Sequence, residues 1–226
     1  MVRKLERWVW IGGGLLALNG GMVNSVGLSS IAQQTVSHVT GTTTLFALAV
    51  GQGNSEMILR AGALVLAFAA GAALAGMIVK SESLKRGRRY AAALGLEAGL
   101  LAVAALVMRE HLMPGLLVTT AACGLQNGLA STYSGAILRT THMTGVITDL
   151  GATAGYLLGR APVDGLRARL HGMLLTAFMG GAIIGGFLYV RIGWRVLFLA
   201  AALTASLAIL YSVLVRPDPD QQSPTP

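Results

Sequence analysis

Long apolar stretches of about 20 residues follow one another along nearly the whole chain, with short polar or basic loops between them. About 20 helical residues cover the roughly 30 Å of hydrocarbon in a bilayer. The chain is 54% hydrophobic and 12% charged, with a mean hydropathy of +0.67. A soluble core cannot hide that much apolar surface. The sequence therefore predicts an all-α integral membrane protein with the lipid bilayer as its main partner.

Six stretches are expected to cross the membrane completely. They cover about residues 8–31, 58–79, 90–108, 114–138, 170–190 and 194–215. Asn19 and Asn24, among several glycines, favour a kink or break in the first of them. Two further runs, at 44–50 and within 142–158, are too short for a crossing, and the first predicts a helix of only about 10 to 13 residues. We expect both to be half-membrane, re-entrant helices, and we expect the Pro-rich tail 216–226 to be disordered.

A polar motif occurs twice. Residues 37–44 (SHVTGTTT) return as 141–148 (THMTGVIT), 104 positions later. A second match, 110 positions apart, pairs 67–76 (AFAAGAALAG) with 177–186 (AFMGGAIIGG). Two matches in the same order indicate an internal duplication. The predicted organisation is one membrane domain over residues 1–215, with repeat one at about 8–110 and repeat two at about 114–215.

The second match also predicts how helices pack. Gly71 and Ala75 are four residues apart, as are Gly181 and Gly185. Small residues at this spacing let two helices approach closely. We therefore assign these four positions to helix packing and not to a ligand.

The 17 Lys and Arg residues predict the topology. If every apolar run crosses the membrane, the basic residues divide nine against eight between its two sides. If the two short runs are re-entrant, thirteen lie inside, as the positive-inside rule requires. Only Arg60, Arg109, Arg191 and Arg195 then lie outside. Each repeat has three spans, an odd number, so we expect an inverted 3+3 repeat with both termini in the cytoplasm.

Polar side chains at membrane depth gather around the two motifs, and such residues are costly unless they serve a function. In inverted repeats, the broken helices of the two halves meet near the midplane and form the binding site. The predicted substrate-binding residues are Asn24, His38, Thr40, Gly41, Thr44, Gln126, Asn127, Arg139, His142, Thr144, Gly145 and Thr148.

Local roles are the alternative for several of these positions. The residues that could cap the short helices are Ser37 or Thr40, and Thr141 or Thr144. The glycines that could allow close backbone approach are Gly41 and Gly145. Arg139 either faces the cavity or anchors the chain at the cytoplasmic surface. Capping is a weaker explanation for His38 and His142, and the amide donors at the start of each short helix favour anions.

Two acidic residues are expected at membrane depth, and neither is repeated. Glu97 lies about half way along its span, and Asp149 lies one turn inside the second short helix, where the first has Leu45. A carboxyl group buried there is expected to be protonated unless it is paired. Both are therefore predicted proton-coupling residues. For Glu97 the alternative is an interhelical hydrogen bond made in the protonated form.

Other functional classes lack their signatures. The sequence has no Walker-type phosphate loop, no HExxH or comparable metal-ligand spacing and no GxSxG motif, so no enzyme, cofactor or metal site is predicted. The net charge of +8 comes from basic loops, which the positive-inside rule and anionic lipid explain without nucleic acid. Cys123 is the only cysteine, which excludes an internal disulfide.

Four segments carry a resemblance to a known family. They are residues 20–27 (GGMVNSVG), 37–43 (SHVTGTT), 124–128 (GLQNG) and 139–151 (RTTHMTGVITDLG). Over about residues 15–215 the chain resembles the YoaK-like family of small bacterial inner-membrane proteins, whose function is uncharacterised. The resemblance implies a multi-pass protein of the bacterial inner membrane. In that pattern an acid commonly follows the first glycines, where this chain has Asn24.

The function that these features favour is membrane transport. We expect a small secondary transporter, or a half-transporter acting as a homodimer, that moves a polar or anionic solute or ion through a site between the two motifs. A passive channel is the second hypothesis, because paired re-entrant segments also build pores. A non-transporting membrane scaffold or sensor is the third.

Overall fold

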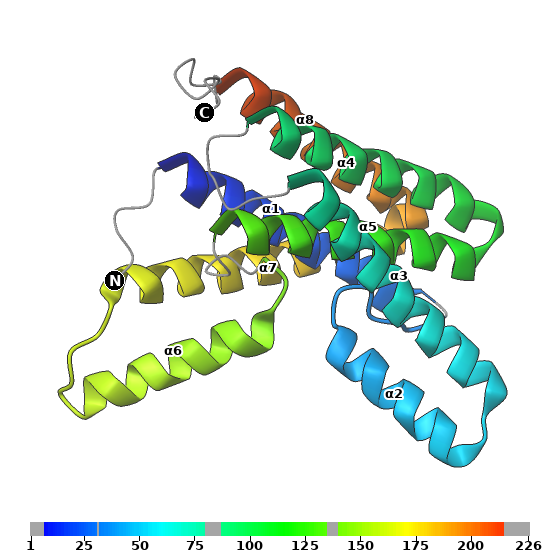
Figure 1. The fold of residues 1–226 in the computed structure, drawn as a ribbon, viewed down its shortest axis with the longest axis horizontal. Helices are drawn as coiled ribbons and strands as arrows, with labels where there is room; N and C mark the ends of the chain where they lie inside the picture. Colours follow the sequence, from blue (N-terminus) through cyan, green and yellow to red (C-terminus); the bar gives the residue numbers. More distant parts are fainter. Residues whose placement is uncertain (1–6, 31, 80–86, 135–139, 215–226) are drawn as a thin grey trace, which may run out of the picture.

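The computed structural model describes residues 7–30, 32–79, 87–134 and 140–214, and all regular structure within them is helical (Figure 1). The elements are α1 (Arg7–Ser29), α2 (Val39–Gln52), α3 (Ser55–Val79), α4 (Gly87–Glu110), α5 (Leu112–Ser134), α6 (Met143–Leu158), α7 (Gly165–Ile192), the 3₁₀ turn η1 (Gly193–Arg195) and α8 (Val196–Leu214). The all-α prediction is confirmed for this part of the chain. The predicted disordered tail lies outside the described residues.

Four described stretches are long and apolar enough to cross a membrane. They are Trp10–Ser29, Ser55–Val79, Arg89–Glu110 and Gly165–Val213, and the last runs through α7, η1 and α8. Gln126 and Asn127 lower the hydropathy of α5, which is not among them. The protein is thus helical with several membrane-spanning candidates.

Helix α1 is continuous, so of the kink or break expected near residues 19–24 the break is wrong, and the kink stays a prediction. Asn19 Nδ2 donates to Thr204 Oγ1 of α8 at 2.9 Å, and Asn24 Oδ1 accepts from Ser37 Oγ at 3.0 Å. An asparagine disrupts a helix when its side chain competes for nearby backbone groups. Here both side chains bond to other segments, which leaves the helical ladder of α1 intact.

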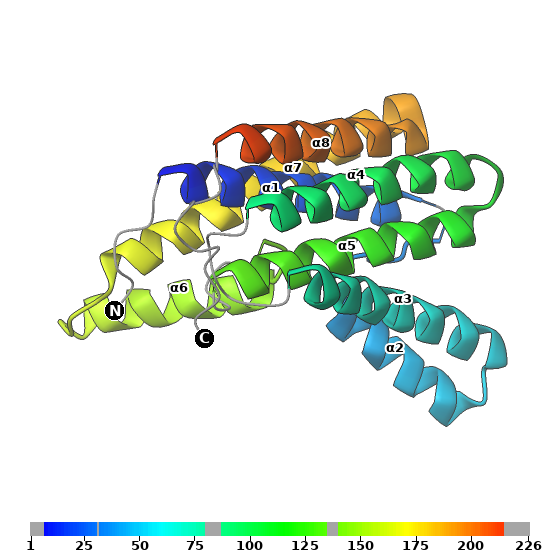
Figure 2. The ribbon, with the colours of Figure 1, turned by 45° about the horizontal axis from the view of Figure 1, so that its top comes forward.

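The long helices pack in matched pairs. Helix α1 lies against α7, and α3 lies against α5. Helix α4 packs on both α8 and α5, and α8 also contacts α1 (Figure 2). If α1 to α4 are taken as equivalent to α5 to α8 in the same order, the α1–α7 pair is equivalent to the α5–α3 pair. The α4–α8 pair is then equivalent to itself. The two halves therefore pack through one repeated set of contacts.

Glycines bring the paired helices close together. A Cβ atom on Gly181 would overlap the carbonyl oxygen of Leu18 in α1, and one on Gly71 would overlap that of Ala121 in α5. A Cβ atom on Gly185 would overlap Ser25 Oγ and would lie 2.7 Å from the carbonyl oxygen of Met22. These contacts confirm that the small residues of the second sequence match serve helix packing.

Helices α2 and α6 are the two short elements, with 14 and 16 residues. At about 1.5 Å per residue neither reaches the roughly 30 Å of a bilayer core, although α2 is slightly longer than predicted. Helix α2 packs on α3, and α6 packs on α7. Both begin near the middle of the molecule and then diverge toward opposite ends of it (Figure 1). Their N-terminal ends are therefore the ends that face the centre.

Candidate functional site

His38 and His142 are the N-cap residues of α2 and α6, and no side-chain hydrogen bond caps either helix. The prediction that a serine or threonine of the motifs caps these helices is therefore wrong. The reason is that Ser37 and Thr141 bond to asparagines of other helices. Each motif thus places a histidine beside the first-turn amides of a short helix.

The two motifs are held in place by equivalent hydrogen bonds. Asn24 Oδ1 on α1 accepts from Ser37 Oγ at 3.0 Å and from Ser37 N at 3.3 Å. Asn127 Oδ1 on α5 accepts from Thr141 Oγ1 at 2.8 Å. In each half, an asparagine of the first long helix holds the hydroxyl residue that precedes the histidine.

His38 is oriented from two directions. Ser37 Oγ lies 3.1 Å from His38 Nδ1. The Ser37 hydrogen is donated to Asn24, so Nδ1–H of His38 is the donor in this contact and Nε2 is an acceptor. The ring also meets that of Phe178 on α7 edge-on, with 5.7 Å between the centroids. Residues from both halves therefore position His38.

The environment of His38 favours its neutral form. His38 precedes α2 and lies outside the four stretches that can cross a membrane. Burial, followed by the nearness of His142, lowers the pKa of His38 from its ordinary value of 6.5. The meeting of the two N-cap histidines in one shared site stays a prediction. His38 is thus an uncharged polar group at neutral pH.

Gln126 joins the second motif to the first half. Its Nε2 atom donates to the carbonyl of Leu16 on α1 at 2.9 Å and to Thr140 Oγ1 at 3.0 Å. Both hydrogens of the buried amide are used in these contacts. Gln126 therefore supports the loop before His142, and this contact fixes the position of that loop relative to α1.

Other predicted residues lie on the outer face of the short helices. Thr44 Oγ1 donates to the carbonyl of Thr40 at 3.0 Å, and Thr148 Oγ1 donates to that of Thr144 at 2.9 Å. All four threonines are exposed and bond within their own helix. A Cβ on Gly41 would meet nothing within 4 Å, so the predicted close approach at Gly41 is wrong.

Two predicted residues can be described only in part. Gly145 is half-buried in the first turn of α6. Arg139 lies outside the described residues. Among the predicted residues, the structure links Asn24 to the first motif and links Asn127 and Gln126 to the residues just before His142.

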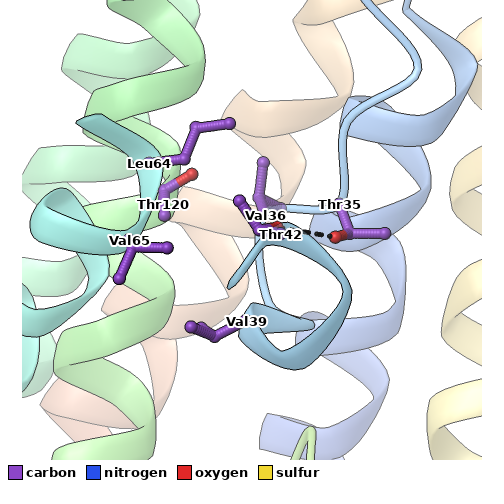
Figure 3. A pocket seen from close by; sticks show the side chains of 7 residues that line it. All are labelled: Thr35, Val36, Val39, Thr42, Leu64, Val65 and Thr120. Atoms are coloured by element: carbon purple, nitrogen blue, oxygen red, sulfur yellow. Dashed lines mark hydrogen bonds between the residues drawn. The ribbon is translucent and has the colours of Figure 1, made fainter. Parts of the chain in front are cut away.

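A narrow hollow lies next to the first motif (Figure 3). The residues that line it are Thr35, Val36, Val39, Thr42, Leu64, Val65 and Thr120. Thr35 Oγ1 and Thr42 Oγ1 are 3.4 Å apart, and the buried Thr120 Oγ1 has no hydrogen-bond partner among the described residues. The hollow has no room for a water molecule in this conformation. It offers three hydroxyl groups in an otherwise apolar lining.

The two predicted acids have different surroundings. Glu97 is 1% exposed and lies inside the helix bundle. Asp149 has a 41% exposed side chain, and its Oδ2 lies 2.9 Å from Arg167 Nη2 and 3.6 Å from Nδ1 of the buried His171 on α7. Asp149 thus forms an ion pair between α6 and α7, whereas Glu97 is buried between helices.

The sequence interpretation missed Thr35, Thr120, His171 and Thr204. The last three interrupt apolar spans, which is the same signal that pointed to Glu97. Thr35 lies two residues before the first motif and shares its hollow. A search for every polar residue within the spans would have found Thr120, His171 and Thr204.

Residues 13–210 match the family described as "Protein of unknown function (DUF1275)". The chain belongs to this family. The DUF1275 match includes both motifs and reaches from α1 to α8, and it agrees with the expected kinship to an uncharacterised family. The narrower YoaK-like grouping stays a prediction. No solved structure matches the chain.

Proposed function

We propose that this protein is a small secondary transporter that binds a polar solute between the N-terminal ends of α2 and α6. The observation that carries the proposal is the matched pair of asparagine bonds, Asn24 with Ser37 and Asn127 with Thr141. These bonds hold the residues that precede His38 and His142, which are the N-cap residues of the two short helices. Paired helix starts of this kind are how many transporters recognise their substrates.

The chemistry of the site favours a polar solute that can both donate and accept hydrogen bonds. First-turn amides donate, and no side chain caps either short helix. Neutral His38 offers Nε2 as an acceptor. An anion would gain from the two helix ends but would not use that acceptor. A neutral or partly anionic solute with hydroxyl or amino groups fits this combination.

The proposed architecture has six full spans and two half-membrane helices in an inverted 3+3 repeat. Support comes from the packing, because exchange of the two halves converts each helix pair into an observed pair, either another one or, for α4–α8, the same one. The diverging directions of α2 and α6 also support it (Figure 1). With the positive-inside rule, the protein would lie in the bacterial inner membrane with both termini in the cytoplasm. The alternative assembly is a homodimer in which each chain is a half-transporter. The proposed transport requires neither nucleic acid nor a cofactor.

A passive channel is the second candidate function. A channel needs a continuous path for its ion or solute. The hollow beside the first motif has no room for water, so it offers no such path in this conformation. A scaffold or sensor would need no solute site, and the buried hydroxyl groups and paired histidines would then have no use beyond packing.

Solute uptake by proteoliposomes tests the proposal. A panel of small polar and anionic solutes would be offered to the wild type, His38→Gln and His142→Gln. We expect uptake of at least one solute class by the wild type and about a tenfold or greater loss in each variant, because one good hydrogen bond to the solute is worth about 1.4 kcal/mol. His111→Gln is the matched control, since His111 is exposed between α4 and α5.

The same vesicles separate the alternatives. Uptake against a concentration gradient, driven by an ion gradient, supports a transporter, and uptake only down the gradient supports a channel. Equal uptake by the wild type and both histidine variants would overturn the site. Absence of uptake for every solute class would favour the scaffold or sensor.

A further inference from the structure

Glu97 lies where α4 meets α8, close to α1. Its side chain is 1% exposed, and its neighbours Thr204 and Asn19 are fully buried. Glu97 shares a hydrogen bond with Thr204 on α8, and Thr204 in turn accepts from Asn19 Nδ2 at 2.9 Å. Three helices therefore meet through one chain of polar side chains.

The hydroxyl group of Thr204 determines the direction of these bonds. Thr204 Oγ1 donates its single hydrogen to the carbonyl of Ala200 at 3.2 Å. It accepts from Asn19, which leaves one lone pair for Glu97. Glu97 can satisfy that lone pair only if its carboxyl group carries a proton to donate. With Thr204 donating to Ala200, the bond between Thr204 and Glu97 therefore requires a neutral acid.

Among the described residues, no charged group near Glu97 balances a carboxylate. The titratable groups near it are Tyr90 on the same helix and Cys123 on α5, and Tyr211 on α8 packs against Tyr90 at a tilt, with 4.7 Å between ring centroids. None of these is a cation. Among the described residues, Glu97 Oε2 has no hydrogen-bond partner, and Glu97 takes part in no ion pair. An unpaired buried carboxylate costs several kcal/mol.

We infer that Glu97 is a proton-binding site shared by α1, α4 and α8, and that the Thr204 hydroxyl responds to whether the proton is present. With the proton bound, Glu97 donates to Thr204 and Thr204 donates to Ala200. When the proton leaves, the Thr204 hydrogen turns to the carboxylate and the Ala200 contact is lost. The proton is the only species exchanged, and it passes to or from water.

This position suits a coupling role. The α4–α8 pair is the pair that maps onto itself when the two halves are exchanged, so Glu97 and Thr204 lie where the halves meet. A change in their hydrogen bond acts on both halves together. The coupling role rests on the proposed transport function, whereas the protonated state of Glu97 does not.

Infrared spectroscopy of the reconstituted full-length protein tests the proton site directly. A protonated carboxyl group gives a carbonyl band separate from the carboxylate bands. We expect this band at neutral pH in the wild type, its disappearance in Glu97→Gln, a shifted band in Thr204→Val and a wild-type band in Thr204→Ser. Glu110→Gln is the matched control, because Glu110 lies at the exposed end of the same helix.

The outcomes separate this inference from the proposed function. A wild-type protein without the band at neutral pH, or a band that persists in Glu97→Gln, overturns the proton site whatever the flux. Thr204→Ser and Thr204→Val spectra that are identical overturn the role of the hydroxyl. If the band behaves as expected but proton-driven uptake is equal in wild type and Glu97→Gln, the proton site stands and its coupling role is contradicted.

Discussion

Thr141 Oγ1 donates a hydrogen bond to Asn127 Oδ1 at 2.8 Å, and this contact repeats the bond between Ser37 and Asn24 in the other half. Asn24 and Asn127 are 103 positions apart, whereas the motifs are 104 apart. The contact is therefore kept although the connection between helix and motif differs in length by one residue. This indicates that the position of the motif loop, and not the sequence spacing, is what the two halves share.

Removal of either asparagine is expected to release its motif. In Asn24→Leu or Asn127→Leu, a hydroxyl group loses its acceptor, which should cost about 1–3 kcal/mol of stability. Thermal unfolding in detergent measures the loss. Thr148→Val is the control, because Thr148 is exposed and bonds within α6. The two asparagine variants should behave alike, and a loss as large in Thr148→Val would contradict the account.

The glycine contacts predict a sharp difference between neighbouring positions. Gly181→Val should destabilise the protein by about 3 kcal/mol or more, because its side chain would meet the backbone of Leu18. Gly180→Val should cost far less, since a Cβ there meets nothing within 4 Å. In the other helix pair, Gly71→Val and Gly76→Val form the same comparison. Similar melting temperatures within a pair would refute the close approach.

The lowered pKa of His38 predicts a pH dependence of stability. The folded state holds this proton less readily than the unfolded state, whose value is about 6.5. Stability should therefore be full above that value and should fall as the pH drops below it and through the lowered pKa. Melting temperatures from about pH 7 to about pH 5 measure the loss. His38→Gln should show a smaller loss than the wild type, whereas the exposed control His111→Gln should match the wild type.

The ion pair of Asp149 with Arg167 should contribute little to stability. Both side chains are substantially exposed, at 41% and 56%, and exposed pairs are worth about 0–1 kcal/mol. Asp149→Asn, Arg167→Gln and the double variant form a cycle that isolates the pair. A coupling energy well above about 1 kcal/mol would show that the contact is shielded from water.

The helices follow from apolar runs whose lengths are fixed by the bilayer. The expected span 58–79 corresponds to α3 at Ser55–Val79, and the small residues at 71 and 181 lie at helix crossings as expected. Such features depend on composition and spacing alone, so sequence can predict them. The short helices were also expected, because a run of some 14 residues cannot span the hydrocarbon.

The hydrogen-bond partners of the polar side chains could not be predicted in the same way. Ser37 and Thr141 have the chemistry of N-caps, yet each bonds to an asparagine on another helix. Asn19 was expected to disturb α1, but Thr204 on α8 satisfies its amide across 185 positions of sequence. A polar side chain forms its hydrogen bond with whichever partner the fold brings close to it. The distances between residues far apart in the chain cannot be obtained from a single sequence.

Cysteine labelling at the outer ends of the two short helices tests the inverted arrangement most directly. Gln52→Cys at the end of α2 and Ala161→Cys after α6 would be made in a Cys123→Ala background, and both positions are exposed. A membrane-impermeant maleimide should label position 52 only from outside and position 161 only from the cytoplasm. If both short helices were full crossings, the two positions would lie on the same side. Labelling of both from one side would contradict the account.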